Sequence, residues 1–253
     1  MAGFCQGGGV GKCIAEWIID GEPSIDVWAM DVARFGDYAS PQYGTIKSSE
    51  NYERRFIMTF PNETLPKGRK QKTTALYDRF INEGAVMGDS FGLENVLWFA
   101  NNKNDAFENP TIKRSRSHDY VSKEVINVRE NVGLIEVANF SKHEFKGPDA
   151  RKFLDHIMAG RLPKPGRISL SPMLSYRGKL CGDLTVACFD ENEFIVFGSG
   201  AAQEMHRRWF ESHLGKFNLN YTNRSDEYHG LSIAGPNSRK VLEKIVRDDV
   251  SNE

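Results

Sequence analysis

The stretch GKLCGDLTVACF, residues 178–189, decides how this chain folds. Its residues alternate with the two-residue period of a β-strand, which places Leu184 and Asp183 on opposite sides of the strand. The sequence DEN at residues 190–192 favours a turn, and residues 193–197 form a second extended run. The stretch therefore predicts a β-hairpin whose first strand carries a carboxylate near its middle.

A carboxylate in the middle of a strand has two interpretations. Antiparallel sheets commonly keep one polar face in water, and from spacing alone Asp183 is most simply a solvent-facing residue of that face. The alternative is a site that requires a negative charge. The alternation of the strand is compatible with both.

The residues around the hairpin resemble the folate-binding domain of the glycine-cleavage T protein, and more closely the same domain of dimethylglycine and sarcosine dehydrogenases. The resemblance rests on five segments in order: GPDARKFL (147–154), ML (173–174), RG (177–178), GDLTV (182–186) and FGSG (197–200). In that family the aspartate of the DLTV segment contacts the reacting edge of tetrahydrofolate, so the resemblance implies a catalytic role for Asp183. It also implies folate contacts from Met173, Leu174, Phe197 and Ser199.

Composition narrows the class of protein. The 253 residues include 33 basic and 34 acidic side chains. A net charge of −1 therefore shows no excess of positive charge of the kind that binds nucleic acid or a membrane surface. No apolar run approaches the roughly 20 residues of a membrane-spanning helix, and the first residues lack the layout of a signal peptide. The 4 cysteines form no CxxC pair, so we expect reduced thiols and no zinc site.

A glycine cluster, GGGVG at residues 7–11, stands ahead of an amphipathic run that ends at Gly21. If the cluster opens the helix, its unpaired N–H groups lie at the positive end of the helix dipole, where an anion is stabilised. A flexible lead into the helix is the alternative interpretation.

The order of the first residues adds a second resemblance. GGGVGK, then WI (17–18), GEP (21–23) and DVARFG (31–36), is similar to the closing segment of the FAD domain in dimethylglycine dehydrogenases. In such flavoproteins this helix points its N-terminus at the flavin pyrimidine ring. The resemblance implies that Gly8, Gly9 and Val10 are the remaining flavin contacts.

The middle of the chain is predicted to be mixed α/β, and a polar boundary region spans residues 101–117. The basic run 67–72 is predicted to be a solvated turn. The expected elements are helices over 41–55, from Thr73 or Thr74 to Gly84, and from Tyr120 to Gly133, with strands at 57–60 and 94–99.

Beyond residue 133 strands and helices follow regularly, with strands at 134–140, 143–146, 168–174, 180–197, 217–222 and 231–233. The first Gly-Pro helix (149–158) should bury Ala150, Phe153, Leu154 and Ile157. A second Gly-Pro helix start at 235–239 repeats the first about 88 residues later, which suggests two related α+β subdomains. A helix from residue 201 should turn Met205 and Trp209 inward, and the six histidines should be surface residues.

The predicted fold class is α+β, with incomplete T-protein-like folate-binding subdomains after a mixed α/β remnant of an FAD-dependent oxidoreductase domain. Residues 1–37 are assigned to that remnant, 38–117 to a central linking segment and 118–253 to the start of the folate-binding domain.

The resemblance implies a fragment of a flavin- and folate-dependent dimethylglycine or sarcosine dehydrogenase, which demethylates the amine and passes the carbon to tetrahydrofolate. The parent family is enzymatic, whereas the fragment is expected to be inactive alone and to bind no FAD. The partner is a small N-methylated glycine in the bacterial cytoplasm or mitochondrial matrix, with no nucleic acid, membrane or metal. A stand-alone tetrahydrofolate-binding aminomethyltransferase and a non-catalytic folate-binding module are the alternatives.

Overall fold

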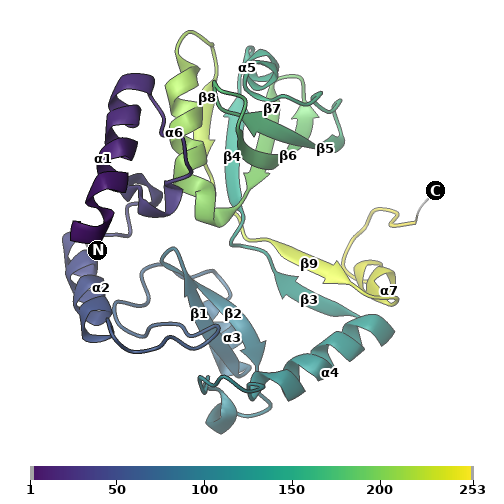
Figure 1. Cartoon of the computed structure of the whole chain (residues 1–253). Coiled ribbons are helices and arrows are strands. Elements are labelled where there is room, and N and C mark those ends of the chain that lie inside the picture. Colours follow the sequence, from purple (N-terminus) through teal and green to yellow (C-terminus); the bar gives the residue numbers. More distant parts are fainter. Residues whose placement is uncertain (1–2, 252–253) are drawn as a thin grey trace.

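A five-stranded antiparallel sheet forms the centre of the computed structural model, which describes residues 3–251 (Figure 1). The strand order is β5-β6-β7-β4-β8, and α5 and α6 supply the core packed on one face. The bounds are β4 Ser141–Lys146, β5 Arg167–Leu174, β6 Leu180–Asp190, β7 Glu193–Gly198, β8 Asn220–Asn223, α5 Ala150–Ile157 and α6 Gln203–Leu214.

The hairpin predicted from residues 178–197 is confirmed as β6 and β7. The two strands are antiparallel, with Val186 opposite Val196. Leu184 and Val186 are fully buried, whereas Asp183 is exposed. The period-two pattern therefore placed the core face of the sheet correctly.

The first Gly-Pro helix is also confirmed. Gly147 has φ 144°, and a Cβ there would lie 2.7 Å from Leu219 Cα, so this turn requires glycine. The helix that follows buries the predicted residues Ala150, Phe153, Leu154 and Ile157.

The inward face of α6 differs from the prediction. His206 and Phe210 are buried, while Met205 and Trp209 are only partly buried. Both pairs are spaced by four residues, so helical periodicity alone could not choose between the two adjacent stripes. The expectation that all histidines lie on the surface is wrong for His206, and equally for His143 of β4, which is fully buried.

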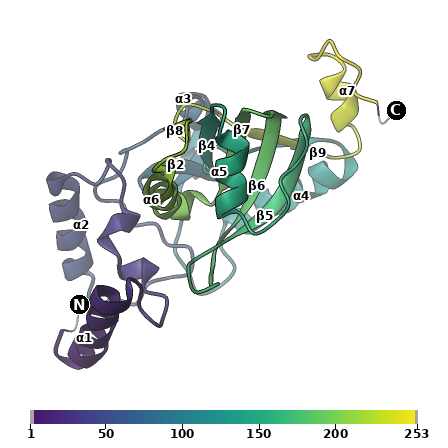
Figure 2. The same ribbon diagram turned by 90° about the horizontal axis from the view of Figure 1, so that it is seen from above.

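Two smaller units flank the central sheet. The β1–β2 hairpin packs its Trp98 against α4, and β3 pairs with β9 in a ribbon that carries α7 away from the central sheet (Figures 1 and 2). Gly235 has φ 115° at the second Gly-Pro start, matching the first. The bounds are α3 Tyr77–Asn82, β1 Ala85–Ser90, β2 Leu93–Phe99, α4 Ser117–Glu130, β3 Gly133–Glu136, β9 Leu231–Ala234 and α7 Ser238–Leu242.

The N-terminal region corrects two expectations. Helix α1 runs over Gly3–Asp20 and contains the glycine cluster, instead of beginning after it. Glycine is a poor helix former, so the cluster lies in α1 despite its local propensity. Residues 57–60 pair with no strand within residues 3–251, so the strand expected there is absent. The predicted helix over 41–55 is confirmed as α2 (Pro41–Glu53), capped by the Ser40 side chain.

The basic run at residues 67–72 is only in part the expected solvated turn: Lys67, Lys70 and Gln71 are exposed, whereas Arg69 is not. The Arg69 guanidinium pairs with Glu94, and the Lys67 N–H donates a 2.8 Å hydrogen bond to Glu50. Lys72 forms a parallel bridge with Leu93. Buried carboxylates need cationic or N–H partners, and this run provides them.

Among residues 3–251, no helix combines the length and the apolar character needed to cross a membrane.

Candidate functional site

Asp183 lies on the sheet face opposite α5 and α6. Its neighbour Leu184 points into the core, so the alternation of β6 directs Asp183 to the other side. Asp183 stands opposite Pro172 of β5, and Thr185, two residues on, stands opposite Phe197 of β7. The carboxylate forms no ion pair or hydrogen bond with any of residues 3–251 and is free to accept hydrogen bonds from a ligand.

The residues expected beside Asp183 divide between the two faces. Phe197 is half-buried next to Thr185, and Ser199 is exposed just after β7. Leu174 is 36% exposed, whereas Met173 is fully buried opposite Gly182. Met173 therefore faces the core, and its side chain offers no surface to a ligand on the Asp183 face.

The face around Asp183 is apolar. Ile168 and Leu170 of β5 are 68% and 67% exposed, and Leu170 stands opposite Thr185. A carboxylate beside exposed aliphatic groups and an aromatic ring suits a planar heterocycle that carries N–H donors: the apolar groups cover the ring, and the carboxylate accepts the N–H hydrogen bonds.

A buried polar cluster, which the sequence analysis did not find, lies on the core face behind this surface. His206 Nε2 lies 3.2 Å from the carbonyl oxygen of Cys181, and His143 Nδ1 lies 2.8 Å from the hydroxyl of Tyr221. Burial lowers the pKa of His143 to about 3 and also lowers the pKa of His206. Both imidazoles are therefore neutral near pH 7.

A cavity of about 660 Å³ opens where β7 ends. Ser199 lies in its wall, together with residues of the N-terminal segment and the start of α6. The charged lining residues are Arg34, Lys72, Arg207, Asp37, Glu204 and Asp226. Arg207 pairs with Glu204 at 2.8 Å and Lys72 with Asp226 at 3.2 Å, so the lining charges largely neutralise one another.

The three residues expected to contact a flavin lie within α1 and not at its first turn. Gly8, Gly9 and Val10 lie inside α1, so their N–H groups are directed along the helix rather than at a ligand. The glycine residues of the cluster meet nothing within 4 Å of a built Cβ, so no packed surface surrounds them. Within residues 3–251, the glycine cluster therefore does not form the N-terminal end of a helix.

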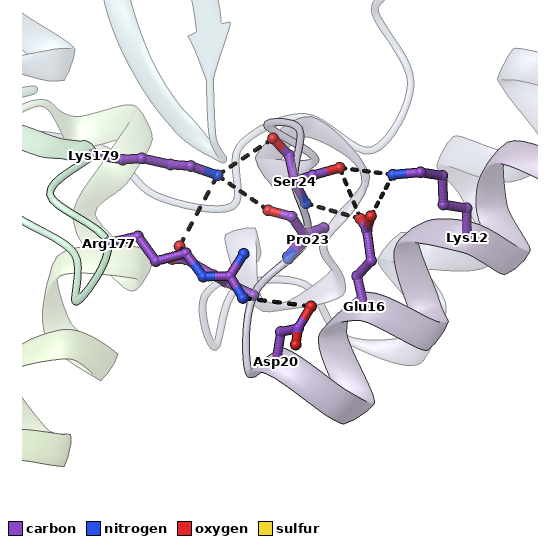
Figure 3. A network of polar contacts seen from close by, with 8 residues as sticks. Lys12, Glu16, Asp20, Pro23, Ser24, Arg177 and Lys179 are labelled. Atoms are coloured by element: carbon purple, nitrogen blue, oxygen red, sulfur yellow. Dashed lines mark hydrogen bonds and ion pairs between the residues drawn. The ribbon is translucent and has the colours of Figure 1, made fainter.

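A polar network holds α1 against the central domain (Figure 3). The Glu16 carboxylate accepts hydrogen bonds from Lys12 and from the N–H and hydroxyl of Ser24, and these bonds lower its pKa to about 2. The turn between β5 and β6 reaches the same place: Arg177 pairs with Asp20 at 3.4 Å, and Lys179 Nζ donates to the Ser24 carbonyl at 3.3 Å. This turn leads directly into the strand that carries Asp183.

Comparison with known proteins yields two family matches. The family described as GCVT N-terminal domain matches residues 76–253, and the family described as FAD dependent oxidoreductase central domain matches residues 20–74.

The mitochondrial dimethylglycine dehydrogenase of Mus musculus is 33% identical over 255 residues, covering 99% of this chain and 29% of the mouse protein. The mitochondrial sarcosine dehydrogenase of Homo sapiens is 26% identical over 299 residues, covering 100% of this chain and 32% of the human protein. This chain thus spans less than a third of these relatives' lengths.

Among solved structures, the glycine cleavage system aminomethyltransferase T from Bartonella henselae aligns with a TM-score of 0.56 at 22% identity. The alignment covers 68% of this chain and 43% of the other. At this identity the likeness shows the fold alone.

Proposed function

Since the chain belongs to the family described as GCVT N-terminal domain, we propose that it is the folate-binding part of a flavin- and folate-dependent N-methylglycine dehydrogenase. The predicted resemblance to dimethylglycine and sarcosine dehydrogenases and the T-protein-like α+β fold class are confirmed. The activity of the whole enzyme belongs to the proposal, because the chain covers 29% of the mouse relative. The divisions at residues 37 and 117 remain predictions.

The observation that carries this proposal is the position of Asp183. Its unpaired carboxylate stands on an exposed apolar sheet face, in the DLTV segment and two residues before Thr185, which lies opposite Phe197. The pterin ring of tetrahydrofolate is planar and carries N–H donors, so it matches this surface in shape and polarity. Tetrahydrofolate supplies two amines that take up a one-carbon unit.

The residues of this chain have separate roles in the proposal. Asp183 accepts a hydrogen bond from a folate amine and holds or takes a proton there, as a general base would. Phe197 and Leu174 cover the ring, and Ser199 places a hydroxyl at the mouth of the cavity beyond β7. Met173 contributes from behind, by packing the strand in the core.

A flavin belongs to the proposed parent enzyme and not to this chain. The helix that carries Gly8 and Gly9 offers no free N-terminal N–H groups at the glycine cluster. The substrate in the proposal is an N-methylated glycine, either dimethylglycine or sarcosine, and the compartment is the bacterial cytoplasm or the mitochondrial matrix. Purified chain should show no stoichiometric flavin absorbance, and a stoichiometric flavin spectrum would contradict this part of the proposal.

The test is a titration of the ¹⁵N-labelled chain with 5-formyltetrahydrofolate, a stable analogue, followed by amide chemical shifts. We expect shifts at residues 183–186 and 197–199. Asp183→Asn should weaken binding about tenfold, since a hydrogen bond to a charged group contributes about 1.5 kcal/mol or more. Asp155→Asn, an exposed carboxylate on α5, is the control and should bind normally. Shifts confined to other surfaces, or equal affinities of all three proteins, would overturn the proposal.

The same substitution also has a catalytic readout in a full-length relative carrying this segment. Asp183→Asn should keep amine oxidation but slow transfer of the carbon to folate, so free formaldehyde rises relative to methylene-tetrahydrofolate. An unchanged product ratio would remove Asp183 from the chemistry and leave it a solvent-facing strand residue.

A further inference from the structure

The backbone at Asp183 has less support from the sheet than the second half of β6. The pairing of β6 with β7 begins at Thr185, so the strand around Asp183 pairs only with β5. The register with β5 also shifts just before it, because Gly182 pairs with Met173 while Leu180 pairs with Leu174. Cys181 is thus the extra residue of a β-bulge, and a bulge leaves its residue outside the regular ladder.

His206 packs on the core face of the sheet at the place where β6 is not paired with β7. It projects from α6 and is 2% exposed. A Cβ built on Gly182 would lie 2.7 Å from His206 Nε2, and one built on Gly198 would lie 2.9 Å from Nδ1. The imidazole therefore contacts β6 at Gly182 and the end of β7 at Gly198, two glycines that leave room for it.

The imidazole also makes the hydrogen bond that the bulge lacks. Nε2 lies 3.2 Å from the carbonyl oxygen of Cys181, and because a carbonyl only accepts, Nε2 is the donor. Nδ1 is buried and has no hydrogen-bond partner within residues 3–251. This arrangement fixes one neutral tautomer, with the proton on Nε2.

We propose that His206 is a positioning residue, which sets the backbone of Asp183 and of the segment from Gly198 to Ser199 for the ligand. The inference rests on the proposed folate function and adds the residue that orients its site. His206 itself touches no ligand, because it lies on the core face. It acts through the bulge at Cys181 on one side and through Gly198 on the other.

A core-filling role alone would make a different prediction. A side chain that only fills volume can be replaced by an apolar one of similar size with a change in stability and no change in ligand affinity. A positioning residue is sensitive to loss of the donor, and a substitute that keeps the donor restores its effect. The pair His206→Leu and His206→Gln separates these two roles, because Gln retains an N–H near the position of Nε2.

The experiment measures the affinity of each variant for 5-formyltetrahydrofolate by the same amide titration. We expect His206→Leu to weaken binding about fivefold or more and to move the unliganded amide signals of Asp183 and Ser199, whereas His206→Gln should bind nearly as the parent does. Ile157→Val, a buried change on α5, is the control for lost stability and should leave affinity unchanged. Gly182→Ala, whose methyl would press on Nε2, should weaken binding in the same way and provides a second variant if His206→Leu does not fold.

The outcomes distinguish the positioning role of His206 from the proposed folate function. If the parent chain binds and His206→Leu or Gly182→Ala binds equally well, the positioning role is overturned while the proposed function stands. If His206→Gln loses as much affinity as His206→Leu, the donor bond is not what positions the strand, and the inference is again overturned. If the unsubstituted chain does not bind 5-formyltetrahydrofolate, the proposed function is overturned, and so is this inference.

Discussion

Arg69 Nε donates a 2.9 Å hydrogen bond to Glu94 Oε1 within an ion pair whose carboxylate side chain is only 2% exposed. Arg69 lies in the part matched by the oxidoreductase central domain, and Glu94 lies in the part matched by the GCVT N-terminal domain. The pair therefore joins the two matched regions. The Arg69 guanidinium also donates to the Met87 carbonyl at 3.0 Å, which ties it to both strands of the β1–β2 hairpin.

Arg69→Met should destabilise the chain strongly, because it leaves Glu94 buried without its cation. Breaking one side of a buried pair costs about 3–5 kcal/mol. Lys67→Met in the same run is the control, since its pair with Glu53 is half-exposed and contributes no more than about 1 kcal/mol. Urea denaturation measures both free energies of unfolding, and equal losses would show that the Arg69 pair is not a buried anchor.

Acid should destabilise the fold through His143. Burial lowers its pKa from 6.5 to about 3, so the folded state keeps the imidazole neutral while the unfolded chain binds a proton below its ordinary pKa. The unfolded state thus holds more protons, and the free energy of unfolding falls as pH falls. The expected slope approaches about 1.4 kcal/mol per pH unit in the window between about pH 6 and about pH 3, the pKa of the folded state.

The control for that slope is His143→Gln, which removes the titrating group. Its unfolding free energy should change less steeply between about pH 6 and pH 5, a range above the titration of ordinary carboxylates. His206 contributes in the same direction, because burial lowers its pKa too, so the variant keeps part of the slope. Identical slopes for parent and variant would mean that His143 is not held neutral by the fold.

Alanine at the glycine cluster should stabilise α1. Gly8 and Gly9 lie inside the helix, and a built Cβ on either meets nothing within 4 Å. Replacing a mid-helix glycine by alanine gains about 1 kcal/mol of helix stability. Gly200→Ala is the opposite case, because its Cβ would lie 1.9 Å from the Asn139 carbonyl oxygen.

Circular dichroism and thermal melts distinguish these variants. Gly8→Ala and Gly9→Ala should raise helical signal without lowering the melting temperature, whereas Gly200→Ala should lower it. A loss of helical signal in Gly8→Ala would mean that the cluster is not helical in solution. The glycine cluster would then be better interpreted as the segment that precedes the helix.

The parts of the fold that could be predicted from sequence are those fixed by neighbours along the chain. The alternation around Leu184 and the glycine at residue 147 determine a strand face and a helix start locally, and both are confirmed. His206 could not be found in this way, because its stripe on α6 has the same spacing as that of Met205. Only the tertiary structure shows its role, because Gly182 and Gly198 lie far apart in sequence and together leave room for the His206 imidazole.

The basic run at residues 67–72 also shows where prediction from neighbouring residues fails. A cluster of lysines and arginines is usually solvated, and only the buried position of Glu94, far along the chain, makes Arg69 a structural residue. Similarly, the site around Asp183 could be predicted as a strand face with a carboxylate. The burial of Met173 on the other side of the sheet could not be predicted in this way, because it depends on the register between β5 and β6.

The attachment of α1 depends on charge rather than on a core. No residue of α1 is buried. The helix meets the β5–β6 turn through the pair of Arg177 with Asp20, and Lys179 binds the carbonyl oxygen of Pro23 just after the helix. Arg177 pairs with Asp20 at 3.4 Å and with Glu22 at 3.4 Å, and all of these side chains are at least partly exposed. Exposed pairs of this kind contribute about 1 kcal/mol or less each and weaken as salt rises.

The double variant Arg177→Gln/Lys179→Gln should therefore release α1 while leaving the central sheet intact. We expect faster amide hydrogen exchange over Gly3–Asp20, with the strands of the central sheet exchanging as before. Raising salt to about 1 M, where the Debye length is about 3 Å, should produce the same change in the parent chain and little further change in the variant. Lys216→Gln, an exposed lysine outside this network, is the control. If α1 exchanges at the same rate in parent and double variant at low salt, contacts other than these ion pairs hold the helix.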